Sequence, residues 1–133
     1  MKRKITEKYT VSEDKKLIGH IGAYAIVVNE KEELLIIGET EFNLSARGVN
    51  WVQIIPATKE FLESGDKKDN ERTIADVFDI QDNQVYYIVS FAGITAYIFE
   101  DFNIALEMVQ FITEFKAQGL IHKAEQNAST EQK

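Results

Sequence analysis

Apolar residues gather in short runs through the first half of the chain. Two of these runs, HIGAYAIVV (20–28) and ELLIIGE (33–39), flank the polar segment NEKE and predict a β-hairpin. Both runs are almost continuously apolar, which indicates strands buried on both faces. The alternating stretch TEKYTV (6–11) predicts a further strand ahead of the hairpin.

The middle of the chain combines a strand signal with a short helix signal. VNWVQII (49–55) predicts a strand that ends at Pro56. TKEFLES (58–64) then predicts one or two helical turns, because Thr58 suits the N-cap position.

The last third begins with three further apolar runs. An Ala-Gly pair separates the final two of them, and Gly93 supplies the positive φ that a two-residue hairpin turn requires. Strands are therefore predicted at 73–80, 85–91 and 94–99.

The clearest periodic signal lies in DFNIALEMVQFITEFKAQG (101–119). Apolar residues recur there at steps of three and four, which is typical of an amphipathic helix. Asp101 or Asn103 suits its N-cap and Gly119 its C-terminal stop. The apolar stripe consists of Ile104, Met108, Phe111, Ile112 and Phe115.

These elements predict a single α+β domain over residues 1–122, followed by a disordered polar tail at 123–133. Short connections between consecutive strands favour antiparallel pairing. We expect about six to seven strands, forming a mostly antiparallel sheet or a small β-barrel, with the one C-terminal helix packed on it.

Composition and charge narrow the class of protein. The chain has 133 residues, 44% of them hydrophobic and 28% charged, as is typical of a globular domain. It lacks Cys, which excludes disulfides and thiolate chemistry. Residues 1–16 hold six basic and three acidic residues, a charge of +3, so the remainder carries −10 of the total of −7. An acidic body disfavours DNA as a partner.

No pattern in the sequence predicts catalysis, a metal or a cofactor. The seven Gly residues have neither Walker nor dinucleotide-binding spacing. The two His residues, His20 and His122, are far apart and lack acidic partners at ligand spacing. No Ser lies in a GxSxG elbow. We therefore expect a protein that is not an enzyme.

The segment SARGVNWVQIIP (45–56) is the most plausible contact surface in the sequence. It holds the only Trp and a Gly-flanked Arg, and Trp and Arg dominate protein interfaces. Gln53 shares a strand face with Trp51, which indicates that this face is partly exposed to solvent. The predicted binding residues here are Arg47, Asn50, Trp51 and Gln53.

Two functions are compatible with these features. The first is a small cytoplasmic binding or regulatory protein that acts through protein–protein contact, with a protein partner or as a homodimer. The alternative is a β-rich RNA-binding regulator that adds the basic residues Lys2, Arg3 and Lys4 to the loop at Arg47–Trp51. No apolar run reaches the about 20 residues of a membrane span, so no membrane contact is expected.

Overall fold

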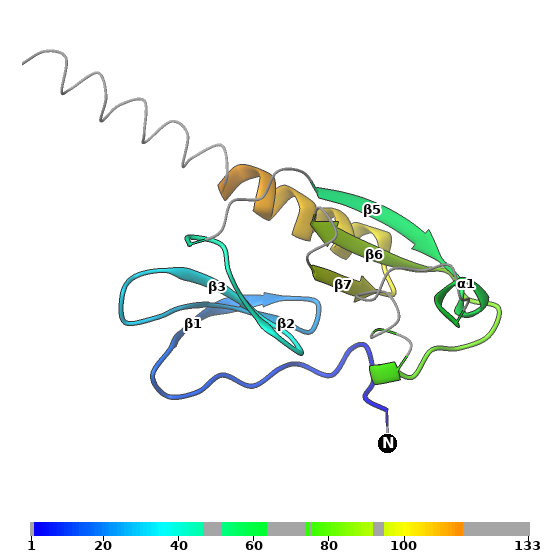
Figure 1. The fold of residues 1–133 in the computed structure, drawn as a ribbon, viewed down its shortest axis with the longest axis horizontal. Coiled ribbons are helices and arrows are strands. Elements are labelled where there is room, and N and C mark those ends of the chain that lie inside the picture. The colour runs from blue at the N-terminus through cyan, green and yellow to red at the C-terminus, as the bar shows by residue number, and fades with distance from the viewer. Residues whose placement is uncertain (1, 47–51, 64–73, 75, 92–94, 116–133) are drawn as a thin grey trace, which may run out of the picture.

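Two antiparallel sheets and a C-terminal helix form an α+β domain (Figure 1). The computed structural model describes residues 2–46, 52–63, 74, 76–91 and 95–115. In this part of the chain the sheets stay open, so the barrel alternative was wrong. The elements are β1 (Lys16–Ile21), β2 (Tyr24–Val28), β3 (Leu34–Ile37), β4 (Glu41–Asn43), β5 (Val52–Ala57), α1 (Lys59–Glu63), β6 (Tyr86–Phe91), β7 (Thr95–Phe99) and the C-terminal helix at 102–115.

The first sheet has the order β1-β2-β3-β4, and each neighbouring pair is antiparallel. The predicted hairpin is confirmed as β2–β3, closed by a turn in which Asn29 Oδ1 accepts hydrogen bonds from the amides of Lys31 and Glu33 at 3.0 and 2.9 Å. Between Leu17 and Gly19 the register of β1 shifts against β2. The resulting β-bulge leaves Ile18 without a partner in β2.

The second sheet has the order β5-β6-β7. Contrary to expectation, Pro56 does not end β5: it pairs with Tyr87 and the strand continues to Ala57. Proline is tolerated there because β5 is an outer strand of the described sheet, where alternate N–H groups point away from the neighbouring strand. The central strand β6 is buried on both faces, with Tyr86 and Ile88 at 0% exposure on one face and Val89 at 0% on the other.

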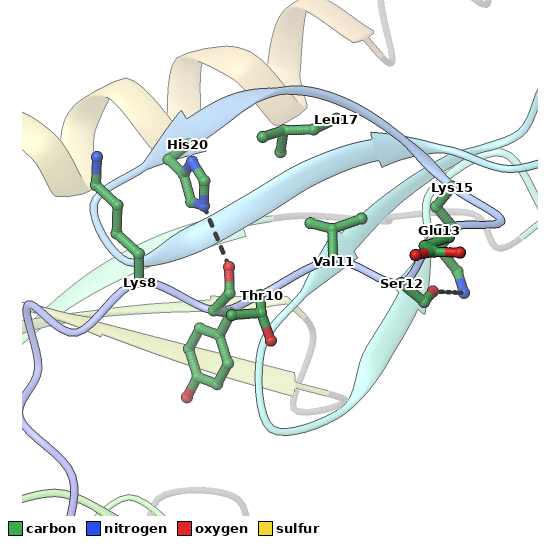
Figure 2. A pocket seen from close by; sticks show the side chains of 9 residues that line it. Lys8, Thr10, Val11, Ser12, Glu13, Lys15, Leu17 and His20 are labelled. Atoms are coloured by element: carbon green, nitrogen blue, oxygen red, sulfur yellow. Dashed lines mark hydrogen bonds between the residues drawn. The ribbon is translucent and has the colours of Figure 1, made fainter.

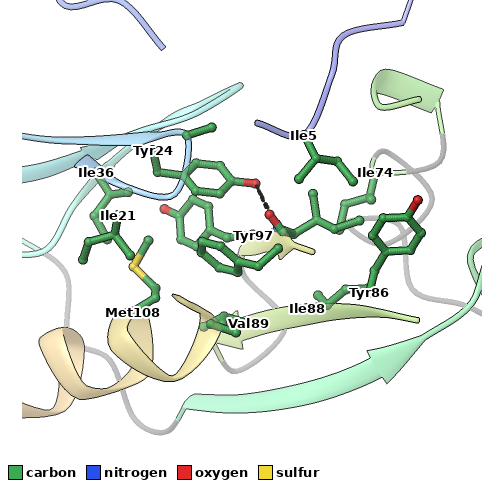
Figure 3. Packing of buried hydrophobic residues seen from close by; sticks show 14 of the residues in the cluster. Ile5, Ile21, Tyr24, Ile36, Ile74, Tyr86, Ile88, Val89, Tyr97 and Met108 are labelled. Carbon is green, nitrogen blue, oxygen red and sulfur yellow. Dashed lines mark hydrogen bonds between the residues drawn. The ribbon is translucent and has the colours of Figure 1, made fainter. Parts of the chain in front are cut away.

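One hydrophobic core joins the two sheets to the C-terminal helix (Figure 3). Met108 of the helix points toward Ile21 of the first sheet, and both belong to the same core cluster as Val89 of the second sheet. The helix buries Ala105, Met108 and Ile112 at 0–1% exposure, as its periodicity predicted. Phe111 of the predicted stripe is only partly buried.

The segment predicted as a strand at 6–11 is instead part of an irregular N-terminal strap, which we define as residues 2–15. The strap makes only isolated backbone contacts with the described strands and turns. Arg3 forms a parallel bridge with Phe78, in which Arg3 N donates to Val77 O at 3.0 Å and Asp79 N donates to Arg3 O at 2.9 Å. Tyr9 N donates to Ala23 O at 2.9 Å. Its Val11 packs on Ala25, Val27 and Leu35, on the face of the first sheet that points away from the main core. The strap thus explains why β2 is buried on both sides.

Two further predictions of strands were wrong in part. The run 20–28 is split by a turn at Gly22, whose φ is 59°, so that β1 ends and β2 begins within it. The run 73–80 is helical at 74, 76 and 77, where Phe78 N donates to Ile74 O at 3.0 Å. Ile74 and Phe78 are both buried and lie four residues apart, which is the spacing of a helix.

The helix starts agree with the sequence. Thr58 Oγ1 accepts a hydrogen bond from Phe61 N at 3.3 Å, and Asp101 Oδ1 accepts one from Asn103 N at 2.7 Å. Gly93, Gly119 and the tail at 123–133 lie outside the described residues. Among those that are described, no helix is both long and apolar enough to cross a membrane.

Candidate functional site

Arg3, Tyr9 and Glu39 hold the N-terminal strap to the domain. Arg3 Cζ lies 3.8 Å from the centre of the Tyr9 ring. The Tyr9 hydroxyl donates to Glu39 Oε1 at 2.9 Å, and Arg3 Nη1 lies 3.8 Å from the same oxygen. Arg3 Nη2 also donates to the Glu7 carbonyl at 2.7 Å and lies 3.5 Å from its carboxylate. The charge of Arg3 is therefore compensated by groups of the protein itself.

An aromatic chain continues from this cluster into the core. Tyr9 stacks on Tyr24 with ring centres 5.6 Å apart, and Tyr24 meets the rings of Tyr97 and Phe99 edge-on at 4.6 and 5.4 Å. The Tyr24 hydroxyl accepts a hydrogen bond from Ile98 N at 2.8 Å and donates to Ile98 O at 3.4 Å. Tyr24 thereby connects the strap and first sheet to the outer strand β7 of the second sheet.

Replacing Arg3 with alanine is expected to lower the free energy of unfolding by about 1–2 kcal/mol, because it removes a cation–π contact and a charge-assisted hydrogen bond. Urea denaturation measures the change. Lys4→Ala is the matched control, since Lys4 is the exposed neighbouring cation, and it should stay within about 0.5 kcal/mol of wild type. Equal effects of the two substitutions would contradict this role of Arg3.

The Tyr9 hydroxyl is held in its neutral form. Burial raises the pKa of Tyr9 above the ordinary value of 10.0, and the hydrogen bond to Glu39 raises it further. The nearby Arg3 opposes this shift without reversing it. Folded Tyr9 therefore keeps its proton in a pH range where the unfolded chain releases it.

This difference predicts a loss of stability at alkaline pH. Above about pH 10 the unfolded state binds fewer protons than the folded state, so the free energy of unfolding falls as pH rises. Urea denaturation from about pH 8 to about pH 11 should show this decline. Tyr9→Phe should make it shallower, because the phenol that differs between the two states is gone. Parallel curves for the two proteins would show that Tyr9 does not contribute.

Between the strap and β1 lies an open groove with a volume of about 540 Å³ (Figure 2). Val11 points from the strap toward the sheet, and His20 points from β1 toward the strap, where its Nε2 lies 3.2 Å from the Tyr9 carbonyl oxygen. Because a carbonyl only accepts, we assign this nitrogen as the donor. The groove is lined by Lys8, Tyr9, Thr10, Val11, Ser12, Glu13, Lys15, Leu17 and His20.

The wall of this groove is an outer strand with exposed aliphatic side chains. β1 pairs only with β2 among the described strands. Its Leu17 is 47% exposed and its Ile18 is 60% exposed. Leu17 and His20 pair with Val27 and Ala25, so both side chains lie on the groove face of the sheet. The structure thus presents an apolar strip beside unpaired strand backbone.

The two ends of the groove differ in charge. Figure 2 shows Lys8 beside His20 at one end and Lys15 beside Glu13 and Ser12 at the other. Lys15 Nζ is already engaged, 3.5 Å from Asp14 Oδ2 and 3.6 Å from Glu41 Oε2. Lys8 is exposed and forms no ion pair within the described part of the chain.

A smaller hollow of about 240 Å³ lies between the strap, the turn at Gly22 and the start of the C-terminal helix. Its lining is mainly apolar, with Glu100 and Asp101 among its residues. The helix start explains Asp101, which caps it. The described residues contain no cluster of His, Cys, Asp and Glu that would hold a metal ion.

The surface predicted from the sequence lies only in part within the described residues. Arg47, Asn50 and Trp51 lie outside the described residues. Gln53 is half-buried on β5, opposite Ser90 of β6. Lys2 and Lys4 are exposed, whereas Arg3 is committed to Tyr9 and its carboxylate partners.

Leu17 and Ile18 were not among the residues predicted from the sequence, because the predicted strand begins at His20. A signal for this edge was present in the sequence: a pair of aliphatic residues lies between Lys16 and Gly19, a combination that suits a charged, bulged sheet edge.

Comparisons with protein-family models, with curated proteins and with solved structures found no match to this chain.

Proposed function

We propose that this chain is a non-catalytic, cytoplasmic protein-binding module that holds an extended segment of a partner protein along the edge of β1. One observation carries the proposal: Leu17 and Ile18, adjacent on an outer strand, are 47% and 60% exposed, and Leu17 lines the groove. A partner segment that pairs with β1 gains main-chain hydrogen bonds, and its alternate side chains reach the groove.

Edge protection alone is a weaker explanation of β1. Sheet edges are commonly guarded by lysines and bulges, and β1 has Lys16 and the bulge at Ile18. Such protection requires no exposed aliphatic side chains. The exposed side chains of Leu17 and Ile18 instead favour association at this edge. The bulge is compatible with both roles, because it restricts the registers in which a partner strand can pair.

The RNA-binding alternative gains less support from the described residues. It needs cations that are available to phosphates, and Arg3 is held between Tyr9 and Glu39. It would depend on Lys2, Lys4 and the undescribed loop that contains Arg47 and Trp51.

A displayed library of peptides of about eight residues, long enough to pair along β1, tests the proposal. Peptides enriched on the wild-type protein should lose about tenfold or more in affinity for Leu17→Asp, because a charge replaces the apolar contact. Val85→Asp is the matched control, since Val85 is 45% exposed and lies outside the groove. Fluorescence anisotropy measures both affinities.

The result would count against the proposal if no peptide were enriched, or if Leu17→Asp and Val85→Asp had equal effects. Far-ultraviolet circular dichroism and a thermal melt establish that both variants are folded. Neither residue belongs to the main core, so both should retain the wild-type spectrum.

A further inference from the structure

We infer that the segment bound at β1 runs antiparallel to it and carries an acidic residue two positions before an aliphatic one. This inference rests on the proposed function and specifies the chemistry of its partner. Three features of the groove lead to it: its charge, the spacing of its side chains and the direction of its strand.

The charge comes from Lys8. Its side chain lines the groove together with His20, and it forms no ion pair within the described part of the chain. The nearby acidic residue Glu7 already pairs with Arg3. At the other end Glu13 lines the groove and Lys15 is neutralised by Asp14 and Glu41. A carboxylate of the partner is therefore favoured only at the Lys8 end.

The spacing comes from the pairing of β1 with β2. His20 and Leu17 lie opposite Ala25 and Val27, which are two residues apart. The two groove-facing side chains of β1 are thus separated by two steps of an extended strand, about 7 Å. An added strand meets them with side chains i and i+2: the carboxylate near Lys8 and His20, and the aliphatic group against Leu17 and Val11.

The direction follows from strand polarity. Every pair of named strands in the described part of the chain is antiparallel, and antiparallel pairs are slightly more stable for each residue than parallel ones. β1 runs from Leu17 to His20, so an antiparallel partner reaches His20 first. Its acidic residue therefore precedes its aliphatic residue.

A second copy of the chain fits this groove less well. β1 itself has the sequence KLIGHI and holds no acidic residue that a second copy could place beside Lys8. An extended acidic segment of another protein supplies that carboxylate.

The test uses the tightest peptide from the library, with Glu, Gln or Lys at the position that faces Lys8, and one peptide with the reversed sequence. At low salt, affinity should fall about fivefold from Glu to Gln and again from Gln to Lys, and the differences should shrink as salt is raised. Lys8→Glu should invert the order. Lys4→Glu, an exposed strap variant outside the groove, should leave it unchanged.

Other outcomes separate the two proposals. Equal affinities for Glu, Gln and Lys peptides, still lost with Leu17→Asp, would overturn the inference and leave the protein-binding function standing. Preference for the reversed peptide would also overturn the inference. Absence of any binding peptide, a stable dimer in sedimentation that peptides fail to dissociate, or displacement of the peptide by a single-stranded RNA oligonucleotide would overturn both.

Discussion

Tyr24→Ala is expected to lower the free energy of unfolding by about 3–5 kcal/mol, a large part of the total stability of a domain this size. The ring is 3% exposed and contacts three other aromatic rings, those of Tyr9, Tyr97 and Phe99. Its loss leaves a cavity between the strap and the two sheets. It also leaves the backbone of Ile98 without its hydroxyl partner. Urea denaturation measures the change.

Tyr24→Phe separates the two contributions. The ring stays, but the buried Ile98 amide loses the acceptor at 2.8 Å, which should cost about 1–3 kcal/mol. Tyr24→Ala should therefore be the more damaging of the two. A Tyr24→Ala protein as stable as wild type would contradict the account of Tyr24 as the connection between the sheets.

Met108→Ala should cost about 2–5 kcal/mol, because the side chain is fully buried where the C-terminal helix meets both sheets. Truncation removes its apolar contacts and leaves a cavity in the core cluster that also contains Ile21 and Val89. Thermal and urea denaturation should both show the loss.

Phe111→Ala is the comparison on the same helix. Its ring is only partly buried, so its truncation should cost less, about 1–2 kcal/mol. If Phe111→Ala were the more damaging variant, the C-terminal helix would face the core with the Phe111 side and not with the Met108 side.

Local signals accounted for most of the fold. The hairpin β2–β3 and the C-terminal helix were predictable because residues close in sequence determine them: Asn29 closes the turn, and apolar side chains recur along 102–115 at helical spacing. The continuous apolar character of β2 also indicated burial on both faces correctly. The structure adds the reason, which is Val11 of the strap on the outer face.

The prediction failed where long-range pairing decides the structure. In TEKYTV the alternation is real, since Tyr9 and Val11 both pack on the domain, but the segment forms no ladder with any strand that the structure describes. Alternation indicates that one face of a segment is buried, but it does not indicate whether the segment pairs with another strand. In 73–80 the spacing of Ile74 and Phe78 fits a helical turn. The three other apolar residues of this segment made its pattern look like that of a strand.

The candidate site was least accessible to sequence reasoning. Composition pointed to Trp51 and Arg47, because aromatic and cationic residues dominate interfaces. Exposure of Leu17 depends instead on β1 being the outer strand of its sheet, which follows from the order of the strands. The role of Arg3 likewise depends on Glu39, far away in sequence.

Amide hydrogen exchange by NMR, with and without a peptide from the library, tests the proposed function most directly. The outward-pointing amides of β1 should become protected by about tenfold or more when the peptide binds, because they gain hydrogen-bond partners. The amides of β5 and β7, the outer strands of the other sheet, serve as internal controls and should stay unchanged. Unchanged exchange along β1 in the presence of a saturating peptide, or protection at β5 or β7 instead, would contradict the account.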